Sequence, residues 1–327
     1  MMFKRQVQIF YTTDPGFAVP TLASIQSIRK WPSAKNTIIN IILVGMTSEQ
    51  VDVFASLAKD LDVKIHTLGL ETLAGFNNEN FNKTHVPFTA LARFRIADFI
   101  GDQSEIDILY IDGDTWFVGD PQPLLDLPAP EVGLLAAEDQ SFFYANDIGK
   151  TGRNARKYFS NIGIDQKRGY FNSGLLKCRA LEWAKISRKA LAYLEANLAI
   201  CQYHDQSALN AVAGSDRVRL SPAWNFQTAY WIWGADNLVE PKLLHFAGGG
   251  KPWMGMHQSW MDIYAEYTHA IQSHSHPLFP LGVWNAEEQA YSARAEALAA
   301  LKYGSIFLYR RIERRALFRG LLNSSVL

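Results

Sequence analysis

Two acidic side chains at the end of an apolar run are the strongest chemical signal in the sequence. Residues 108–118 read ILYIDGDTWFV, so a buried strand would deliver Asp112 and Asp114 with Gly113 between them. Buried carboxylates must be solvated, paired or bound to a cation, and two of them at i and i+2 can converge on one hard metal ion. Gly113 would leave room for a ligand backbone or a phosphate to approach. An ordinary turn rich in Asp and Gly is the alternative interpretation.

A histidine and a glycine-rich turn far downstream complement the acidic pair. His245 ends the short apolar run of LLHFAGGGKPW, and Gly248 and Lys251 follow it. Exposed backbone N–H groups and a lysine suit phosphate recognition, although a structural histidine and a flexible loop are the alternatives. Two carboxylates and one imidazole favour manganese or magnesium over zinc. Together these residues predict a site for a metal-bound diphosphate.

The first hundred residues alternate the signals of strands and helices that could position this site. We expect strands over 6–12, 37–44, 63–68 and 106–111. Helices are expected over 17–31, from Thr47 through Asp60, and over 89–100, with a polar loop over 70–86. This β-α-β order predicts a mostly parallel sheet, whose ligands bind at the carboxyl ends of the strands. Thr12, Thr13 and Asp14 fall at such an end, as the acidic pair does.

The remainder of the chain is less regular. Shorter strands are expected over 132–138, 170–178 and 243–246, helices over 181–197 and 204–212, and an aromatic loop over 221–233. The last clear change in composition lies at 277–280. We therefore predict one α/β domain over residues 1–280 and a helical extension over 281–327.

The bulk composition excludes several classes of protein. A chain of 327 residues that is 48% hydrophobic can bury a sizeable core. Basic and acidic residues total 32 each, and this zero net charge argues against nucleic acid as a partner. Cys178 and Cys201 form no metal-binding or disulfide pattern, which favours a reducing compartment. With neither a signal-peptide pattern nor a stretch near the roughly 20 apolar residues of a membrane span, a cytoplasmic protein is expected.

Six segments in order resemble the retaining glycosyltransferases of family 8, which include glycogenin and bacterial lipopolysaccharide galactosyl- and glucosyltransferases. The segments are IFYTTD, ALARFRIADFI, LYIDGDTWFV, YFNSGLL, HDQSALN and LHFAGGGKPW. The resemblance implies a single nucleotide-sugar-binding domain of glycosyltransferase A type with a mostly parallel central sheet. It also implies metal-dependent, retaining transfer of galactose or glucose from a UDP-sugar to a saccharide or glycolipid acceptor of the cell surface.

The resemblance assigns roles to the polar residues of these segments. Asp112, Asp114 and His245 would hold Mn²⁺ or Mg²⁺. The nucleoside would contact Thr12, Thr13 and Asp14. Gly248 and Lys251 would hold the diphosphate, and Arg93 would contact the diphosphate or the sugar. The sugar pocket would be lined by Asn172, Ser173, Asp205 and Gln206. Asp139 would bind a sugar hydroxyl, and Gly113 would lie close to the donor. Asp205 and Gln206 would lie nearest the anomeric carbon as the catalytic candidates.

Ordinary structural interpretations stand beside these roles. Arg93 could be a surface helix residue, Asn172 a turn residue and Asp205 a helix cap. The sequence also departs from the family pattern, because Ser207 replaces the second acid of an Asp-Gln-Asp segment and Pro15-Gly16 follow Asp14 in the first strand. Two routes to retention stay open: front-face attack, or double displacement through Asp205 or Gln206. A non-catalytic sugar-binding protein and a sugar nucleotidyltransferase are the alternative functions.

The end of the chain is helical and basic. Residues 305–319 read SIFLYRRIERRALFR, and five arginines share one half of a helical wheel: Arg310, Arg311, Arg314, Arg315 and Arg319. Such a helix suits an anionic membrane surface, and the alternative is a terminal helix packed on the domain with a solvated basic face. Related bacterial enzymes act on lipid-linked acceptors, so we expect peripheral contact with the inner face of a membrane. No oligomeric state is predicted.

Overall fold

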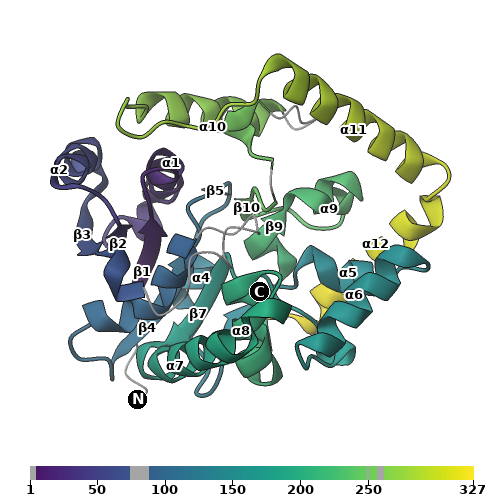
Figure 1. Cartoon of the computed structure of the whole chain (residues 1–327), viewed down its shortest axis with the longest axis horizontal. Helices are drawn as coiled ribbons and strands as arrows, with labels where there is room; N and C mark the ends of the chain where they lie inside the picture. The colour runs from purple at the N-terminus through teal and green to yellow at the C-terminus, as the bar shows by residue number, and fades with distance from the viewer. Residues whose placement is uncertain (1–4, 74–87, 249, 256–260) are drawn as a thin grey trace.

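The computed structural model describes residues 5–73, 88–248, 250–255 and 261–327, and it is built around a twisted seven-stranded sheet (Figure 1). The strand order is β3-β2-β1-β4-β7-β6-β8, and a second sheet has the order β5-β10-β9. The strands of the large sheet are β1 Gln6–Thr13, β2 Ile38–Val44, β3 Val63–Leu68, β4 Ile106–Ile111, β6 Leu135–Ala136, β7 Leu175–Arg179 and β8 Val218–Arg219. The small sheet contains β5 Thr115–Phe117, β9 Phe226–Gln227 and β10 Leu243–His245.

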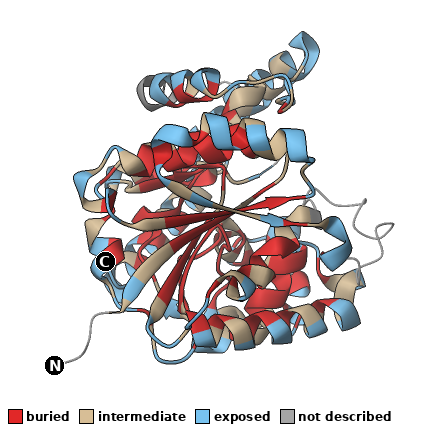
Figure 2. Ribbon diagram, turned by 90° about the vertical axis from the view of Figure 1, so that its left-hand side faces the viewer, coloured by how far each residue is buried: buried red, intermediate tan, exposed pale blue. Residues whose placement is uncertain are grey.

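Four neighbouring strands, β3, β2, β1 and β4, run parallel, whereas β7 is antiparallel to both β4 and β6. Alternate side chains of these strands enter two cores on opposite faces of the sheet. In β1, Ile9 and Tyr11 face one core and Phe10 faces the other. This burial on both faces explains the almost continuous apolar sequence of β2, and Figure 2 shows the buried residues running through the centre.

Helices cover both faces of the large sheet. Their bounds are α1 Ala18–Arg29, α2 Ser48–Leu57, α4 Gln122–Asp126, α5 Gln140–Ala145, α6 Lys150–Asn161, α7 Ala180–Asn197, α8 His204–Ala213, α9 Thr228–Ile232, α10 Met261–Ser273, α11 Ala286–Gly304 and α12 Leu308–Ser324. One core lies beneath α1, α2 and the small sheet, and the other lies beneath α7, α8 and the 3₁₀ helix Phe88–Phe99. The predicted α/β class and mostly parallel sheet are confirmed.

The predictions for the first four strands are accurate, and those for later segments are less so. Thr47 caps α2 as expected, forming a capping box with Gln50. The expected loop over 221–233 is wrong, because Ser221 caps a 3₁₀ helix at Pro222–Asn225 and β9 and α9 follow. The strand expected from residue 170 begins only at β7, and α5, α6 and α10 were not predicted. Residues 74–86 of the expected polar loop lie outside the described residues.

The C-terminal extension arches over the domain and then packs against it. In Figure 1, α10 and α11 run along one edge of the molecule and α12 returns beside α5 and α6. Phe318 and Leu321 of α12 are buried in the core that lies beneath α1, α2 and the small sheet. The backbone of Val326 pairs with Leu220, next to β8, at the edge of the large sheet. Among the described helices, none is both long and apolar enough to cross a membrane. The division near residue 280 stays a prediction.

Candidate active site

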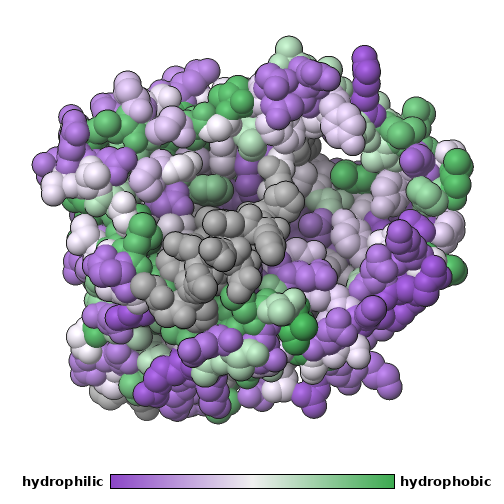
Figure 3. Space-filling model, viewed as in Figure 1, coloured by the Kyte–Doolittle hydropathy of each residue, from purple (hydrophilic) through white to green (hydrophobic). Residues whose placement is uncertain are grey.

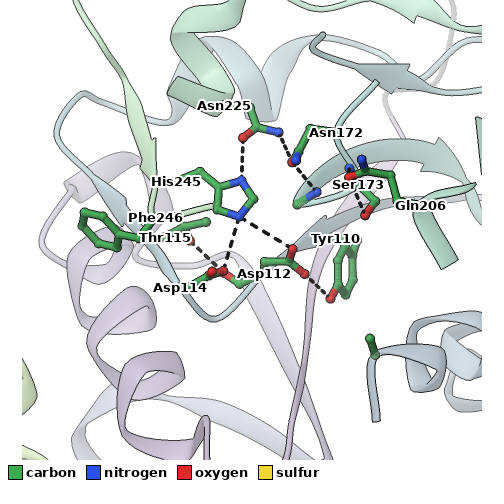
Figure 4. Close-up of polar contacts among 12 residues, drawn as sticks. Tyr110, Asp112, Asp114, Thr115, Asn172, Ser173, Gln206, Asn225, His245 and Phe246 are labelled. Atoms are coloured by element: carbon green, nitrogen blue, oxygen red, sulfur yellow. Dashed lines mark hydrogen bonds and ion pairs between the residues drawn. The ribbon is translucent and has the colours of Figure 1, made fainter. Parts of the chain in front are cut away.

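Asp112, Asp114 and His245 converge at the carboxyl end of β4 (Figure 4). Asp112 and Asp114 occupy the turn between β4 and β5, and His245 ends β10, which pairs with β5 so that His245 lies opposite Thr115. His245 Nε2 lies 3.4 Å from Asp114 Oδ1 and 3.9 Å from Asp112 Oδ2. One ligand atom from each residue lies within 4.8 Å of the other two. Strand pairing therefore unites the motifs that the sequence separates.

In each acid, one carboxylate oxygen points toward His245, and the other accepts hydrogen bonds from residues that are not part of this three-residue cluster. Asp112 Oδ1 accepts hydrogen bonds from Tyr110 Oη at 2.6 Å and from Arg93 Nη2 at 3.0 Å. Asp114 Oδ2 accepts one from Lys251 Nζ at 2.5 Å. Burial raises the pKa of Asp114, but the neighbouring Lys251 ammonium opposes this effect, and the pKa lies below its ordinary value. Two carboxylate oxygens and one imidazole nitrogen form a donor set that fits Mn²⁺ or Mg²⁺.

Two glycines allow this close approach. A Cβ atom on Gly174 would lie 2.2 Å from His245 Cε1 and 2.9 Å from Asp112 Oδ2, so a side chain there would displace a ligand residue. A Cβ atom on Gly113 would lie 2.2 Å from Thr21 Oγ1 of α1. The space on the Cβ side of Gly113 is therefore filled by Thr21, and contact of the Gly113 backbone with a ligand stays a prediction.

Arg93 is buried and bonds several residues of the site, so it is not the surface helix residue of the alternative interpretation. It is 5% exposed, and its guanidinium lies 4.5 Å from the ring centroid of Tyr110. Besides Asp112, it contacts Asp205 Oδ2 at 3.1 Å and donates to the carbonyl oxygen of Ser173 at 3.1 Å. Burial lowers the pKa of Arg93, but the surrounding acids raise it above its usual range. Arg93 thus ties the acidic turn to α8.

The residues expected to line the sugar pocket lie on the far side of Arg93. Ser173 donates its backbone N–H to Gln206 Oε1 at 3.0 Å and its hydroxyl to Asp205 Oδ2 at 3.3 Å. Asp205 is 3% exposed; burial raises its pKa, and Arg93 opposes that shift. His204 before it has a φ of 33°, a left-handed conformation that is strained for a residue with a side chain.

Asp139 and Asn172 form a neighbouring pair in the same region. Asn172 Nδ2 donates to Asp139 Oδ2 at 2.9 Å. Asp139 Oδ1 accepts from the backbone N–H of Ser141 at 2.8 Å and so caps α5. Ser207, the departure from the family pattern, is fully buried and hydrogen-bonds Tyr158 Oη at 2.6 Å. In this chain, Ser207 therefore joins α8 to α6 through Tyr158.

The residues expected to contact a nucleoside lie at the end of β1, where they have local partners. Thr12 Oγ1 lies 3.3 Å from Tyr110 Oη, and Thr13 Oγ1 accepts from the hydroxyl of Thr21 at 3.0 Å. Asp14 accepts from the backbone N–H of Gly16 at 2.9 Å and from the Thr89 hydroxyl at 2.5 Å. Their contact with a nucleoside stays a prediction.

Two residues of the site were not singled out from the sequence. Tyr110 lies within the strand and bonds Asp112, as described above. Asn225 is fully buried, and its Oδ1 lies 2.8 Å from His245 Nδ1. The available signal for Asn225 is a polar residue between Trp224 and Phe226 in an aromatic run. The turn after His245 also needs its glycine, because Gly248 has a φ of 107°.

Sequence comparison places the chain among known proteins. The profile of the family described as Glycosyl transferase family 8 matches residues 8–257. General stress protein A of Bacillus subtilis (strain 168) is 30% identical over 186 residues, which cover 52% of this chain and 60% of that protein. Lipopolysaccharide glucosyltransferase WaaO of Escherichia coli (strain K12) is 25% identical over 263 residues, 76% of this chain and 72% of that protein.

Solved structures share the fold. The galactosyltransferase LgtC, in complex with donor and acceptor sugar analogs, superposes with a TM-score of 0.63 at 20% identity, covering 86% of this chain and 99% of that one. The glycosyltransferase GlyE of Streptococcus pneumoniae TIGR4 gives a TM-score of 0.56 at 18% identity, covering 82% and 62%. The fold is therefore of the predicted glycosyltransferase A type.

Proposed function

The chain belongs to glycosyltransferase family 8, and we propose that it transfers a hexose, galactose or glucose, from a UDP-sugar to a saccharide acceptor with retention of configuration. The observation that carries this proposal is the convergence of Asp112, Asp114 and His245, whose ligand atoms lie within 4.8 Å of one another. Mn²⁺ is the proposed cation, with Mg²⁺ as the alternative. The name of WaaO supports an acceptor in lipopolysaccharide or a related cell-surface glycan.

The protein's own residues would bind and orient the donor diphosphate. Lys251 Nζ lies between Asp114 Oδ2 and the carbonyl oxygen of Phe246, at 2.5 and 2.7 Å, and its long stem can turn toward a phosphate. The turn at Gly248 would add backbone N–H groups. A bound divalent cation would stabilise the negative charge that develops on the leaving diphosphate. With that charge stabilised, the leaving group needs no strong acid to protonate it.

We propose front-face attack, in which the departing phosphate accepts the proton of the acceptor hydroxyl. In a double displacement, Asp205 is the acid that would act as the nucleophile at the anomeric carbon. Its Oδ2 is already engaged by Arg93 and Ser173, so its environment favours a positioning role. Gln206, whose Oε1 accepts from Ser173, would be placed beside the sugar with its neutral amide.

The test is a panel of nucleotide sugars with Mn²⁺, scored for UDP release and for slow hydrolysis of the donor. We expect turnover with UDP-galactose or UDP-glucose and a loss of more than about 100-fold in Asp114→Asn, because electrostatic stabilisation of this size is typical. Asp52→Asn, which changes an exposed acid on α2, is the matched control. If no nucleotide sugar binds or reacts and both variants resemble the wild type, the protein is a non-catalytic member of the family.

We also propose peripheral contact with the inner face of a membrane through the C-terminal helices. The basic face expected from the helical wheel is not entirely free, because Arg314 is 2% exposed and bonds Asp147. Several exposed side chains of this region are apolar, with Leu301 at 69%, Ile306 at 73% and Ile312 at 61% exposure. Figure 3 shows hydrophobic residues at the rim formed by α11 and the start of α12.

Three arginines could add electrostatic attraction beside these apolar residues. Arg311, Arg315 and Arg319 line a shallow hollow of about 390 Å³ together with Leu308 and Ile312. Apolar side chains beside cations suit the boundary between acyl chains and anionic headgroups.

A truncation of α12 would remove buried core residues, so point variants make the sharper test of membrane contact. Ile306→Asp with Ile312→Asp should reduce co-sedimentation with vesicles of anionic phospholipid, because it places charge on the proposed contact surface. Val132→Asp, at a site with 59% exposure on another part of the molecule, is the control. Equal pelleting of all three proteins would exclude this surface.

A further inference from the structure

We infer that Asn225 is a positioning residue that fixes the tautomer of His245 and leaves Nε2 without a hydrogen, ready to bind a cation. The inference deepens the proposed function, because it rests on His245 being a metal ligand. Asn225 lies between His245 and Asn172 (Figure 4). This buried chain of side chains ends at Asp139.

The chain consists of three hydrogen bonds of ordinary length. Asp139 Oδ2 lies 2.9 Å from Asn172 Nδ2, and Asn172 Oδ1 lies 2.9 Å from Asn225 Nδ2. Asn225 Oδ1 then lies 2.8 Å from His245 Nδ1. Asn225 is fully buried, and Asn172 and His245 are 6% and 4% exposed. Water therefore has little access to substitute for these partners.

The direction of the hydrogen bonds from Asn172 to His245 follows from a backbone group that bonds Asn172. The N–H of Gly174 lies 2.9 Å from Asn172 Oδ1, and a backbone N–H can only donate. The atom of Asn172 that faces Gly174 must therefore be its oxygen, which fixes the amide orientation. That oxygen can only accept from Asn225, so the atom of Asn225 facing it is nitrogen. The oxygen of Asn225 then faces His245 and requires a hydrogen on Nδ1.

The consequence appears on the other side of the imidazole ring. A neutral histidine with a hydrogen on Nδ1 carries a lone pair on Nε2. This Nε2 is the atom that lies 3.4 Å from Asp114 Oδ1 and 3.9 Å from Asp112 Oδ2. Partners of this kind orient ligand histidines, and their loss typically weakens metal binding by 10- to 100-fold. The same chain joins the cation site to Asp139 and Asn172 of the predicted sugar pocket.

The tautomer can be measured without a metal or a substrate. The protein contains eight histidines, so His245→Gln would identify the His245 signal in a long-range ¹H–¹⁵N spectrum of ¹⁵N-histidine-labelled, EDTA-treated protein. In the wild type we expect the hydrogen on Nδ1. Asn225→Leu removes the acceptor and should give a mixture of tautomers or the opposite one. Asn225→Asp keeps an acceptor and should retain the wild-type tautomer.

Metal affinity provides a second measurement. With saturating UDP, the Kd for Mn²⁺ should rise about 10- to 100-fold in Asn225→Leu and only a few fold in Asn225→Asp. Both variants should lose thermal stability, because neither retains the amide that donates to Asn172. Asn210→Leu is the matched control: Asn210 is buried and bonds the backbone of Phe171, so its loss should lower stability and leave the His245 tautomer unchanged.

Two results would overturn the inference. One is a hydrogen on Nε2 of His245 in the wild type, and the other is an unchanged tautomer in Asn225→Leu. Where the tautomers behave as expected but the wild type binds neither Mn²⁺ nor UDP, the proposed function fails and the positioning of His245 by Asn225 stands.

Discussion

Replacing Asp147 by asparagine should destabilise the whole protein, because Asp147 neutralises a buried arginine. Arg314 of α12 donates to both carboxylate oxygens of Asp147, and each side chain is 2% exposed. The guanidinium lies among three aromatic rings, with centroids at 4.7 Å for Trp233, 4.8 Å for Tyr144 and 5.3 Å for Tyr303. Asparagine keeps the shape of the side chain and removes its charge.

The size of the effect follows from this burial. Removing one partner of a buried ion pair typically costs about 3–5 kcal/mol. Unfolding entropies near 2.1 cal/mol/K per residue give about 0.7 kcal/mol/K for 327 residues. The melting temperature of Asp147→Asn should therefore fall by about 4–7 °C. Replacing the pair together, as Asp147→Leu with Arg314→Met, should cost less, because no uncompensated charge remains.

Differential scanning calorimetry of the two variants and the wild type provides the measurement. Arg319→Met, at an exposed position of the same helix, is the control and should shift the free energy of unfolding by no more than about 0.5 kcal/mol. The reasoning is refuted if Asp147→Asn melts within about 1 °C of the wild type, far below the shift expected for a buried pair. Such a result would mean that α12 does not pack against the domain as described.

Three further predictions concern the active site. Gly174→Ala would place a Cβ atom 2.2 Å from His245 Cε1, so Mn²⁺ affinity measured by titration should fall by more than about tenfold, and wild-type affinity would contradict this. Arg93→Lys should lower kcat by about 100-fold in a donor hydrolysis assay, because an ammonium cannot reproduce the guanidinium fork that holds two acids, and an unchanged kcat would refute this role. Burial raises the pKa of Asp114, but the Lys251 ammonium opposes burial and the pKa lies below the ordinary value of about 3.9, so its stabilising contribution should be present above that pH and be lost as the pH falls below it. In EDTA, the difference in melting temperature between wild type and Asp114→Asn should shrink below about pH 4, and a constant difference would argue against this pairing.

Local sequence patterns were sufficient to predict the parallel half of the sheet. Apolar runs such as residues 38–44 are long and bounded by polar residues, and Thr47 carries a capping signal that the structure confirms. The antiparallel half uses strands as short as β6 and β8, with two residues each, which are too short to show a period. The segment over 221–233 was wrongly predicted to be a loop, because its helices and its strand are also too short to show a period.

The candidate site was predictable where residue type alone limits the chemistry. Asp112, Asp114 and His245 belong to short motifs whose side chains suit a cation. Tyr110 and Asn225 act only through other residues, and their importance depends on tertiary contacts. The burial of Arg314 in α12 was also unpredictable, because the wheel gives the relative positions of side chains and not the face that packs.

Binding of UDP to the ligand-free protein by isothermal titration calorimetry, in Mn²⁺ and in EDTA, tests the central claim most directly. We predict that UDP binds the wild type in Mn²⁺, that EDTA weakens this binding at least about 100-fold, and that Asp114→Asn in Mn²⁺ binds as weakly as the wild type in EDTA. Equal affinity in Mn²⁺ and EDTA, or wild-type affinity in Asp114→Asn, would contradict a cation site formed by Asp112, Asp114 and His245.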